Sequence, residues 1–197
     1  MPGRFIVFEG IDASGKSTQA RQLADRCGGL FTFEPGDTPL GAELRRWLLD
    51  ASTPMVPQTE ALLMLADRSH HVATVIAPTL AAGRHVIADR FAASTLAYQG
   101  YGRGVDLAAL RTATDLAIGN CRPDITLLID IDIETANERR ARNHEDRFES
   151  ADAAFHERLR QGYLEMAATE DRWCVIDGRG SFDDVRAAIE AALAPLW

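Results

Sequence analysis

The chain is poor in cysteine and has no long apolar run. These two features argue against a disulfide-rich secreted protein and against a membrane-spanning protein. Its three cysteines, Cys27, Cys121 and Cys174, lie far apart and form no CxxC pair. Such a sparse, odd-numbered set predicts reduced thiols in a cytoplasmic protein. The apolar run at residues 5–8 is too short for a signal peptide or a membrane span, so we expect no membrane association.

Blocks of like charge are also missing, although the chain is acidic, with a formal net charge of −8. Binding long nucleic acid requires many cations along the phosphate backbone, so this partner is not expected. Apolar residues make up 46% and charged residues 25% of the 197 positions, as in ordinary globular proteins. No linker or repeat divides the sequence, and we therefore expect a single domain over residues 1–197.

Short apolar runs alternate with longer segments of helical periodicity. We expect strands at residues 5–8, 30–33, 85–88, 125–131 and 173–176. We expect helices at residues 16–27, 39–49, 58–82, 107–119, 134–143, 151–168 and 182–193. Residues 127–129 are continuously apolar, which indicates burial on both faces of a parallel sheet. The pattern predicts an α/β fold, with a doubly wound, five-stranded parallel sheet and helices on both faces.

Residues 98–104, Tyr-Gln-Gly-Tyr-Gly-Arg-Gly, interrupt this pattern. Three glycines in seven residues predict a loop here.

Residues 10–17, Gly-Ile-Asp-Ala-Ser-Gly-Lys-Ser, match the phosphate-binding pattern GxxxxGK[ST] in full. The motif follows an expected strand and opens an expected helix, the context in which it forms a phosphate site. Lys16 is expected to contact the β- and γ-phosphates of ATP, and the Ser17 hydroxyl to ligate Mg²⁺. The residues expected to bind ATP here are Gly10, Ser14, Gly15, Lys16, Ser17 and Thr18.

A P-loop alone does not separate a switch GTPase, a motor ATPase and a small-molecule kinase. The sequence has no Asn-Lys-x-Asp segment, which a GTPase needs to recognise its base. Further motifs at residues 8–19, 34–41, 66–68, 89–91, 94–100 and 122–124 follow the order found in thymidylate kinases. The chain therefore resembles this family of nucleoside monophosphate kinases over nearly its whole length. The resemblance implies transfer of the ATP γ-phosphate to dTMP, with Mg²⁺, giving dTDP and ADP for dTTP synthesis.

The resemblance also implies roles for residues at the acceptor site. Three arginines fall at acceptor-phosphate positions, where a guanidinium pairs well with a dianion: Arg45, Arg68 and Arg90. The sugar is expected to meet Asp12 through its 3′-hydroxyl and Tyr98 at its 2′ position, while Gln99 binds thymine. The remaining dTMP contacts are expected from Glu34, Met64, Ser94 and Thr95. Asp89, at a strand end, is expected to organise Mg²⁺.

An arginine-rich segment at about residues 139–150 resembles the family's lid. A loose phosphoryl-transfer transition state spreads negative charge that a positioned arginine stabilises. Some family members place this arginine in the P-loop, where this chain has Ala13 and Ser14, so the lid is expected to supply it. The candidates are Arg139, which we expect to bind ATP, and Arg142 and Arg147, which join Lys16, Asp12 and Arg90 as expected catalytic residues.

Departures from the family pattern leave alternatives open. Met64 stands where the family usually has a phenylalanine that stacks on thymine, and Asp37 adds a carboxylate near the expected phosphate. Two alternative functions therefore remain: a kinase for another nucleotide such as dUMP, or a non-catalytic nucleotide-binding module. The resemblance further implies a homodimer, for which apolar surface on residues 58–82 is the expected contact.

Overall fold

Five parallel strands form one sheet in the order β2-β3-β1-β4-β5. The computed structural model describes residues 3–50, 52–140 and 153–196. Its strands are β1 (Phe5–Glu9), β2 (Leu30–Phe33), β3 (Val86–Asp89), β4 (Ile125–Asp130) and β5 (Trp173–Asp177). Each strand end lies within one residue of its expected position, and the predicted parallel sheet is confirmed.

Helices follow the strands along the chain, as the alternation predicts. They are α1 (Lys16–Cys27), α2 (Pro39–Leu49), α3 (Pro57–His71), α4 (Ala77–Ala81), α5 (Ala92–Thr95), α6 (Leu107–Ile118), α7 (Ile133–Arg140), α8 (Ala153–Thr169) and α9 (Phe182–Leu193). Two π-helical segments, Val72–Ile76 and Leu96–Gly102, and a final 3₁₀ turn, Ala194–Leu196, complete the described elements.

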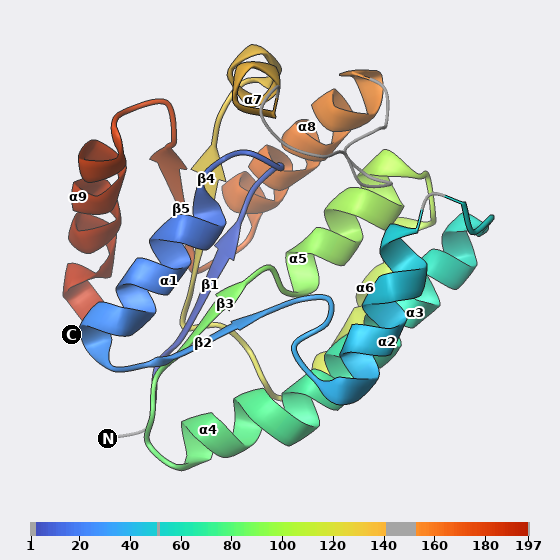
Figure 1. Cartoon of the computed structure of the whole chain (residues 1–197), viewed down its shortest axis with the longest axis horizontal. Helices are drawn as coiled ribbons and strands as arrows, with labels where there is room; N and C mark the ends of the chain where they lie inside the picture. The colour runs from blue at the N-terminus through green and yellow to red at the C-terminus, as the bar shows by residue number, and fades with distance from the viewer. Residues whose placement is uncertain (1–2, 51, 141–152, 197) are drawn as a thin grey trace.

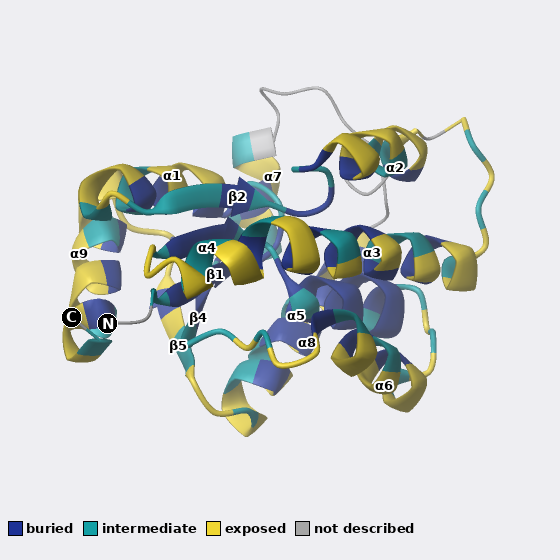
Figure 2. Cartoon of the chain, turned by 90° about the horizontal axis from the view of Figure 1, so that it is seen from below, coloured by how far each residue is buried: buried dark blue, intermediate teal, exposed yellow. Residues whose placement is uncertain are grey.

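Side chains of β1 alternate between two buried faces of the sheet. Ile6 and Phe8 pack with apolar residues of α1 and α9, while Phe5 and Val7 pack in a cluster on the opposite face. Figure 1 shows α1 and α9 on one side of the sheet and α5, α6 and α8 on the other. The central strands β1, β3 and β4 are mostly buried, whereas the edge strands β2 and β5 are mostly partly buried or exposed, and Figure 2 shows the outer faces of the helices exposed. The doubly wound architecture is therefore confirmed.

The expected loop at residues 98–104 is wrong over most of its length, because Leu96–Gly102 is π-helical. Its glycines permit close packing instead of a turn. A Cβ atom on Gly100 would lie 2.4 Å from Leu107, and one on Gly102 would lie 2.5 Å from Phe155 of α8. The glycines therefore let this segment approach α6 and α8 closely, and it carries Tyr98 and Gln99 on a helix.

The long helix expected at residues 58–82 is interrupted. α3 ends at His71, a π-helical turn covers Val72–Ile76, and α4 resumes with Pro78 in its first turn. Proline lacks an N–H group and clashes with the preceding turn of a regular helix, and wider π turns are one way in which a helix absorbs such a disturbance.

All three cysteines are free, as the sequence predicts. No helix among the described residues combines the length and apolar character needed to cross a bilayer.

Candidate functional site

The phosphate motif forms the connection from the end of β1 to the start of α1, as expected from the sequence. Gly10 has a φ of +143°, and a Cβ atom there would lie 2.5 Å from the carbonyl oxygen of Ile129 on β4. Gly15 precedes α1 with a φ of +89°, in the left-handed region that favours glycine. The loop therefore reaches the N-terminus of α1, where free N–H groups attract phosphate.

Lys16 is the only lysine in the sequence, and it lies in this loop. Its side chain is buried, and its Nζ is 3.7 Å from Oδ1 of Asp12. Burial and the nearby guanidinium of Arg90 lower the pKa of Lys16, while Asp89 and Asp12 oppose that effect. Ser17 and Thr18, in the first turn of α1, are exposed and accessible to a ligand.

Asp12 of the P-loop binds both Arg90 and Tyr98. An Arg90 nitrogen donates to Asp12 Oδ1 at 2.6 Å, and the Tyr98 hydroxyl donates to Oδ2 at 2.7 Å. The same Arg90 nitrogen lies 2.9 Å from the Tyr98 hydroxyl. Burial would raise the pKa of Asp12, but Arg90 and then Lys16 hold it well below its ordinary value. Asp12 is therefore a carboxylate held between two cations.

Arg90 follows β3 directly and has a φ of +72°, which is uncommon for a residue with a side chain. Its other terminal nitrogen donates to the Gly10 carbonyl at 3.1 Å, to Ser94 at 3.1 Å and to Tyr163 at 3.2 Å. Such backbone conformations persist where the surroundings fix them, and they cluster at functional sites. The contacts hold Arg90 between the P-loop, α5 and α8.

Glu9 and Tyr163 support this arrangement, and the sequence reasoning assigned neither of them a role. Glu9 is fully buried at the end of β1 and accepts hydrogen bonds from the backbone of Phe91 and from the backbone and hydroxyl of Ser94. The Tyr163 hydroxyl, on α8, donates to Glu9 at 3.1 Å. Burial raises the pKa of Glu9 despite these donors. No local pattern marks Tyr163, which reaches the site only through tertiary packing.

A pocket opens beside the P-loop, between α2, α3 and the segment that follows β3. Its lining residues are Asp12, Glu34, Pro35, Arg45, Leu49, Met64, Asp67, Arg68, Arg90, Ser94, Thr95, Tyr98 and Gln99. Every residue that the resemblance assigns to dTMP is among them. Pro35, Leu49 and Asp67 are additional members, to which the sequence analysis gave no role in binding dTMP.

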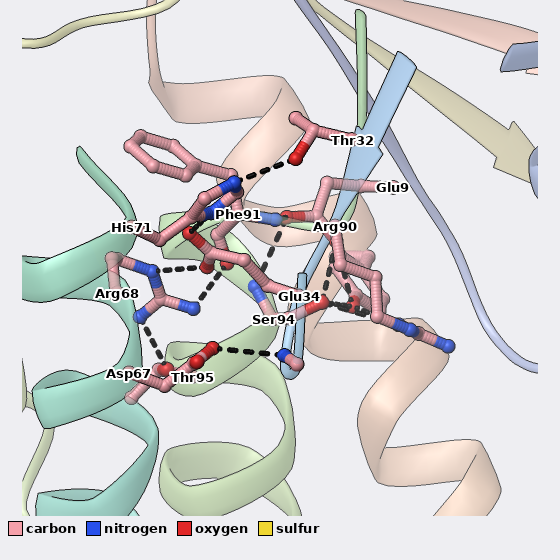
Figure 3. Close-up of polar contacts among 12 residues, drawn as sticks. Glu9, Thr32, Glu34, Asp67, Arg68, His71, Arg90, Phe91, Ser94 and Thr95 are labelled. Atoms are coloured by element: carbon pink, nitrogen blue, oxygen red, sulfur yellow. Dashed lines mark hydrogen bonds and ion pairs between the residues drawn. The ribbon is translucent and has the colours of Figure 1, made fainter. Parts of the chain in front are cut away.

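The three arginines of the pocket differ in how they are held. Arg68 is 2% exposed, and its nitrogens donate to Glu34 at 2.7 Å, to Thr95 at 2.6 Å and to the Phe91 carbonyl at 2.8 Å. Arg45 donates to the Pro35 carbonyl at 2.6 Å and stays partly exposed. Figure 3 shows Arg68 among its partners in the wall of the site. Arg68 thus connects α3 to β2 and α5, in addition to lining the pocket.

Met64 and Gln99 lie at another part of the same pocket. Met64, on α3, is partly buried against an apolar cluster that includes Ala61 and Tyr98. The amide nitrogen of Gln99 donates to the buried carboxylate of Glu60 at 2.9 Å, which orients the Gln99 amide. An oriented amide beside an apolar side chain suits recognition of a planar, polar ring.

Asp37 does not line this pocket. Its carboxylate accepts a hydrogen bond from the hydroxyl of Thr32, on β2. The additional carboxylate noted in the sequence therefore bonds to Thr32 and lies outside the pocket lining.

The residues expected at the metal have free oxygen ligands. Oδ1 of Asp89, at the end of β3, is buried without a hydrogen-bond partner, and Ser17 is exposed. An unsatisfied carboxylate oxygen next to a phosphate loop fits Mg²⁺ or its water shell, because Mg²⁺ prefers oxygen ligands and keeps several waters. Among the described residues no group of three or more His, Cys, Asp or Glu side chains forms an all-protein metal site.

Arg139, in the last turn of α7, reaches the nucleotide loops. Its guanidinium donates to the Ala13 carbonyl of the P-loop at 3.4 Å and to the Gly178 carbonyl after β5 at 3.0 Å. Arg142 and Arg147, with most of the expected lid, lie outside the described residues.

Known proteins resemble this chain over its full length. The family model for thymidylate kinase matches residues 8–189. The thymidylate kinase of Cupriavidus metallidurans is 48% identical over 202 aligned residues, covering 100% of both chains. That of Carboxydothermus hydrogenoformans is 43% identical, covering 100% of this chain and 99% of its own. The crystal structure of thymidylate kinase from Ehrlichia chaffeensis, 33% identical, has a TM-score of 0.81 and covers 98% of this chain and 99% of that one. The chain therefore belongs to the thymidylate kinase family.

Proposed function

We infer that the protein transfers the γ-phosphate of ATP to dTMP, giving dTDP and ADP. The observation that carries this function is the junction between the two substrate sites. Asp12 and Arg90 line the acceptor pocket, and both also contact the P-loop or belong to it. A phosphate in the pocket would thus face a triphosphate in the loop, the proximity that phosphoryl transfer requires.

At the donor end, the loop N–H groups and the start of α1 bind the phosphates of ATP. Lys16 adds a compact charge at the β- and γ-phosphates. Arg139 orients the triphosphate from the side of α7, because its guanidinium already spans the P-loop and the loop after β5. In this proposal Gly10, Ser14, Gly15, Ser17 and Thr18 complete the ATP site.

Ser17 and Asp89 hold Mg²⁺ in this proposal, directly or through its water shell. When bound, the ion neutralises charge on the phosphates of ATP as transfer proceeds. The support is the partnerless oxygen of Asp89 and the exposed hydroxyl of Ser17.

At the acceptor end, Arg90 and Arg45 bind the phosphate of dTMP, and Arg68 lies behind them in the wall. Asp12 accepts the 3′-hydroxyl of the sugar, and the Tyr98 ring, fixed by its bond to Asp12, occupies the space that a 2′-hydroxyl would need. Gln99 binds the polar edge of thymine, and Met64 packs against its ring. Glu34, Ser94 and Thr95 orient these groups through Arg68 and Arg90.

The proposed reaction is direct attack of a dTMP phosphate oxygen on the γ-phosphorus of ATP, with ADP as the leaving group. The attacking phosphate is already an anion, so no protein base has to remove a proton. Lys16 and Arg90 stabilise the charge on the transferred group, and Arg142 and Arg147 of the lid are the proposed additional cations. No covalent enzyme intermediate is needed.

A homodimer is part of the proposal. Leu62 on α3 and Leu116 on α6 are 65% and 86% exposed, and these two helices pack against each other. Large exposed apolar side chains on adjacent elements are typical of protein interfaces. Sedimentation velocity should report a dimer that Leu62→Glu converts to a monomer. The matched control is Leu40→Glu on α2, where the leucine is 47% exposed, and it should leave the dimer intact.

The proposed location is the cytoplasm, where ATP and dTMP are available. The free cysteines support it, since thiols remain reduced there.

An ADP-release assay with Mg²⁺–ATP tests the activity against dTMP, dUMP, dCMP, dGMP, dAMP and the corresponding ribonucleotides. We expect dTMP to be the preferred acceptor and Lys16→Ala to abolish ADP release. Faster turnover with dUMP than with dTMP would leave the proposed phosphoryl-transfer mechanism unchanged but would identify dUMP as the acceptor. Binding of ATP without any acceptor-dependent ADP release would contradict the proposed kinase activity and would favour a non-catalytic nucleotide-binding module.

A further inference from the structure

The imidazole of His71 bridges two elements behind the acceptor pocket. His71, the last residue of α3, is 1% exposed. Its Nε2 lies 2.6 Å from the hydroxyl oxygen of Thr32 on β2, and its Nδ1 lies 2.9 Å from Oε1 of Glu34. Figure 3 shows the ring between these two partners, with Arg68 on the other side of the Glu34 carboxylate. The sequence reasoning gave His71 no role.

The hydrogen-bond partners determine where the ring protons must be. The Thr32 hydroxyl has one proton, and it is donated to the carboxylate of Asp37. A carboxylate has no proton to give back, so Thr32 can only accept from Nε2 of His71. On the other side, Nδ1 faces Glu34, a carboxylate that accepts from Arg68 through its second oxygen. Both ring nitrogens therefore face acceptors, and both require a proton.

We propose that His71 is a positioning residue of the acceptor site, kept as an imidazolium by the Asp37–Thr32 pair so that it fixes Glu34 and, through Glu34, Arg68. The positional part of this inference rests on contacts alone. Its consequence for dTMP rests on the proposed function.

Two donors on opposite sides leave the Glu34 carboxylate one orientation. Arg68 Nε binds one oxygen at 2.7 Å and His71 Nδ1 approaches the other at 2.9 Å. With its Nε in that bond, Arg68 directs its two terminal nitrogens to Thr95 and to the Phe91 carbonyl. His71 thus fixes the relative positions of β2, α3 and α5, three walls of the acceptor pocket.

Charges around the ring come from several elements. Glu34 and Asp37 lie after β2, and Asp67 and Arg68 lie on α3, while the thiol of Cys121, after α6, lies near Glu34. Burial and the charge of Glu34 raise the pKa of Asp67 to about 6, and burial raises the pKa of Cys121 to about 11, so the thiol carries no charge at neutral pH. The positive charge of an imidazolium at His71 compensates the negative charge of one of the buried carboxylates. Arg68 then does not have to neutralise the whole charge of Glu34, and its positive charge favours a phosphate dianion nearby.

Position 37 offers a direct test, because a carboxylate can only accept a hydrogen bond from Thr32, whereas an amide also has an NH2 group that can donate to it. When the NH2 group of the new side chain in the Asp37→Asn variant faces Thr32, the Thr32 hydroxyl accepts from it and its own proton is available to Nε2 of His71. The ring should become neutral and keep only its Nδ1 proton toward Glu34. Asp37 does not line the acceptor pocket, so the substitution leaves the substrate contacts in place.

Nitrogen-15 NMR of histidine-labelled protein reads this protonation state without any assay of activity. The sequence has five histidines, and loss of one ring signal set in His71→Gln assigns His71. At neutral pH we expect two ring N–H signals for His71 in the wild type and one in Asp37→Asn. A neutral ring in the wild type, or an unchanged imidazolium in Asp37→Asn, would overturn the proposal. Neither result depends on the protein being a kinase.

Kinetics test the functional consequence in the same variants. Asp37→Asn should raise the KM for dTMP several-fold while the KM for ATP stays within error, because only the acceptor wall is changed. His71→Gln, which keeps a donor for Glu34, should retain more of the wild-type kcat/KM for dTMP than His71→Leu. The control is Asp183→Asn on the exposed start of α9, a residue that does not line the pocket. Equal activities of the glutamine and leucine variants would contradict a positioning role through Glu34.

Discussion

The guanidinium of Arg90 lies 2.6 Å from the carboxylate of Asp12, although the two residues are 78 positions apart in the sequence. The pair joins the end of β3 to the P-loop between β1 and α1. Because parallel strands β1 and β3 are neighbours, their carboxyl ends meet at one edge of the sheet. The contact places an acceptor-site cation against the donor loop, where charge develops during phosphoryl transfer.

Replacing Arg90 by lysine should separate charge from geometry. Lysine keeps one positive charge but cannot bind Asp12 and the hydroxyl of Tyr98 while also reaching Gly10. We expect kcat/KM for dTMP to fall by about 10²–10³-fold, the effect of losing a preorganised donor at a developing anion. The matched control is Arg46→Lys, at an exposed arginine on α2 that pairs with Glu43, and it should behave as wild type. Wild-type kinetics in Arg90→Lys would show that charge alone suffices.

Lys16 can be observed alone, because the chain has no other lysine. In protein labelled with carbon-13 lysine, one Cε signal reports the ionisation of its amine. Burial and Arg90 lower the pKa of Lys16 in the nucleotide-free protein. Binding of Mg²⁺ with a non-hydrolysable ATP analogue should raise this pKa, since the phosphates favour the charged amine. An unchanged titration on saturation with the analogue would place Lys16 away from the phosphates.

Met64→Phe should strengthen thymine binding. Met64 lines the pocket from α3, and phenylalanine supplies a rigid ring face where methionine supplies a flexible chain. Aromatic stacking contributes about 0.5–1.5 kcal/mol, so the KM for dTMP should fall about 2–10-fold. The KM for ATP serves as the internal control. A higher KM for dTMP would indicate that the ring has displaced the base.

Asp67→Asn should stabilise the protein at neutral pH. Asp67 is buried, and burial followed by the charge of Glu34 raises its pKa to about 6. The folded wild type therefore holds a proton that the unfolded chain releases at lower pH, and its unfolding free energy decreases from about pH 4 to about pH 7. Asparagine does not titrate. The unfolding free energy of Asp67→Asn relative to that of the wild type should therefore increase over that interval, by at most about 3 kcal/mol, because one pKa unit corresponds to about 1.4 kcal/mol.

Urea denaturation of both proteins at several pH values in that interval measures the difference. Glu43→Gln on the exposed face of α2 controls for loss of a carboxylate without burial. A difference that does not change with pH would show that Asp67 titrates normally in the fold.

The local features of this protein can be predicted from the order of its residues. The five strands fall within one residue of their expected ends because short apolar runs bounded by turn residues report burial directly. The P-loop follows from one motif, since its glycines, lysine and serine have to be adjacent in the chain. The residues that the resemblance assigned to dTMP all line one pocket, because their motifs follow strand ends or lie on the helices beside them. Their individual roles remain predictions.

Which side chains meet in the site depends on the fold and could not be predicted from local patterns. Glycines at residues 98–104 predicted a loop, yet they permit a π-helical segment to pack against α6 and α8. Tyr163 and His71 belong to no local motif, but each is buried at the site through partners on other elements. Asp37 stands near the expected phosphate in the sequence, but in the fold its carboxylate bonds to Thr32 outside the pocket lining. Periodicity and motifs depend on residues that are close in the sequence, so they predict local structure. Hydrogen-bond partners depend on the fold, because the fold brings residues together that are distant in the sequence.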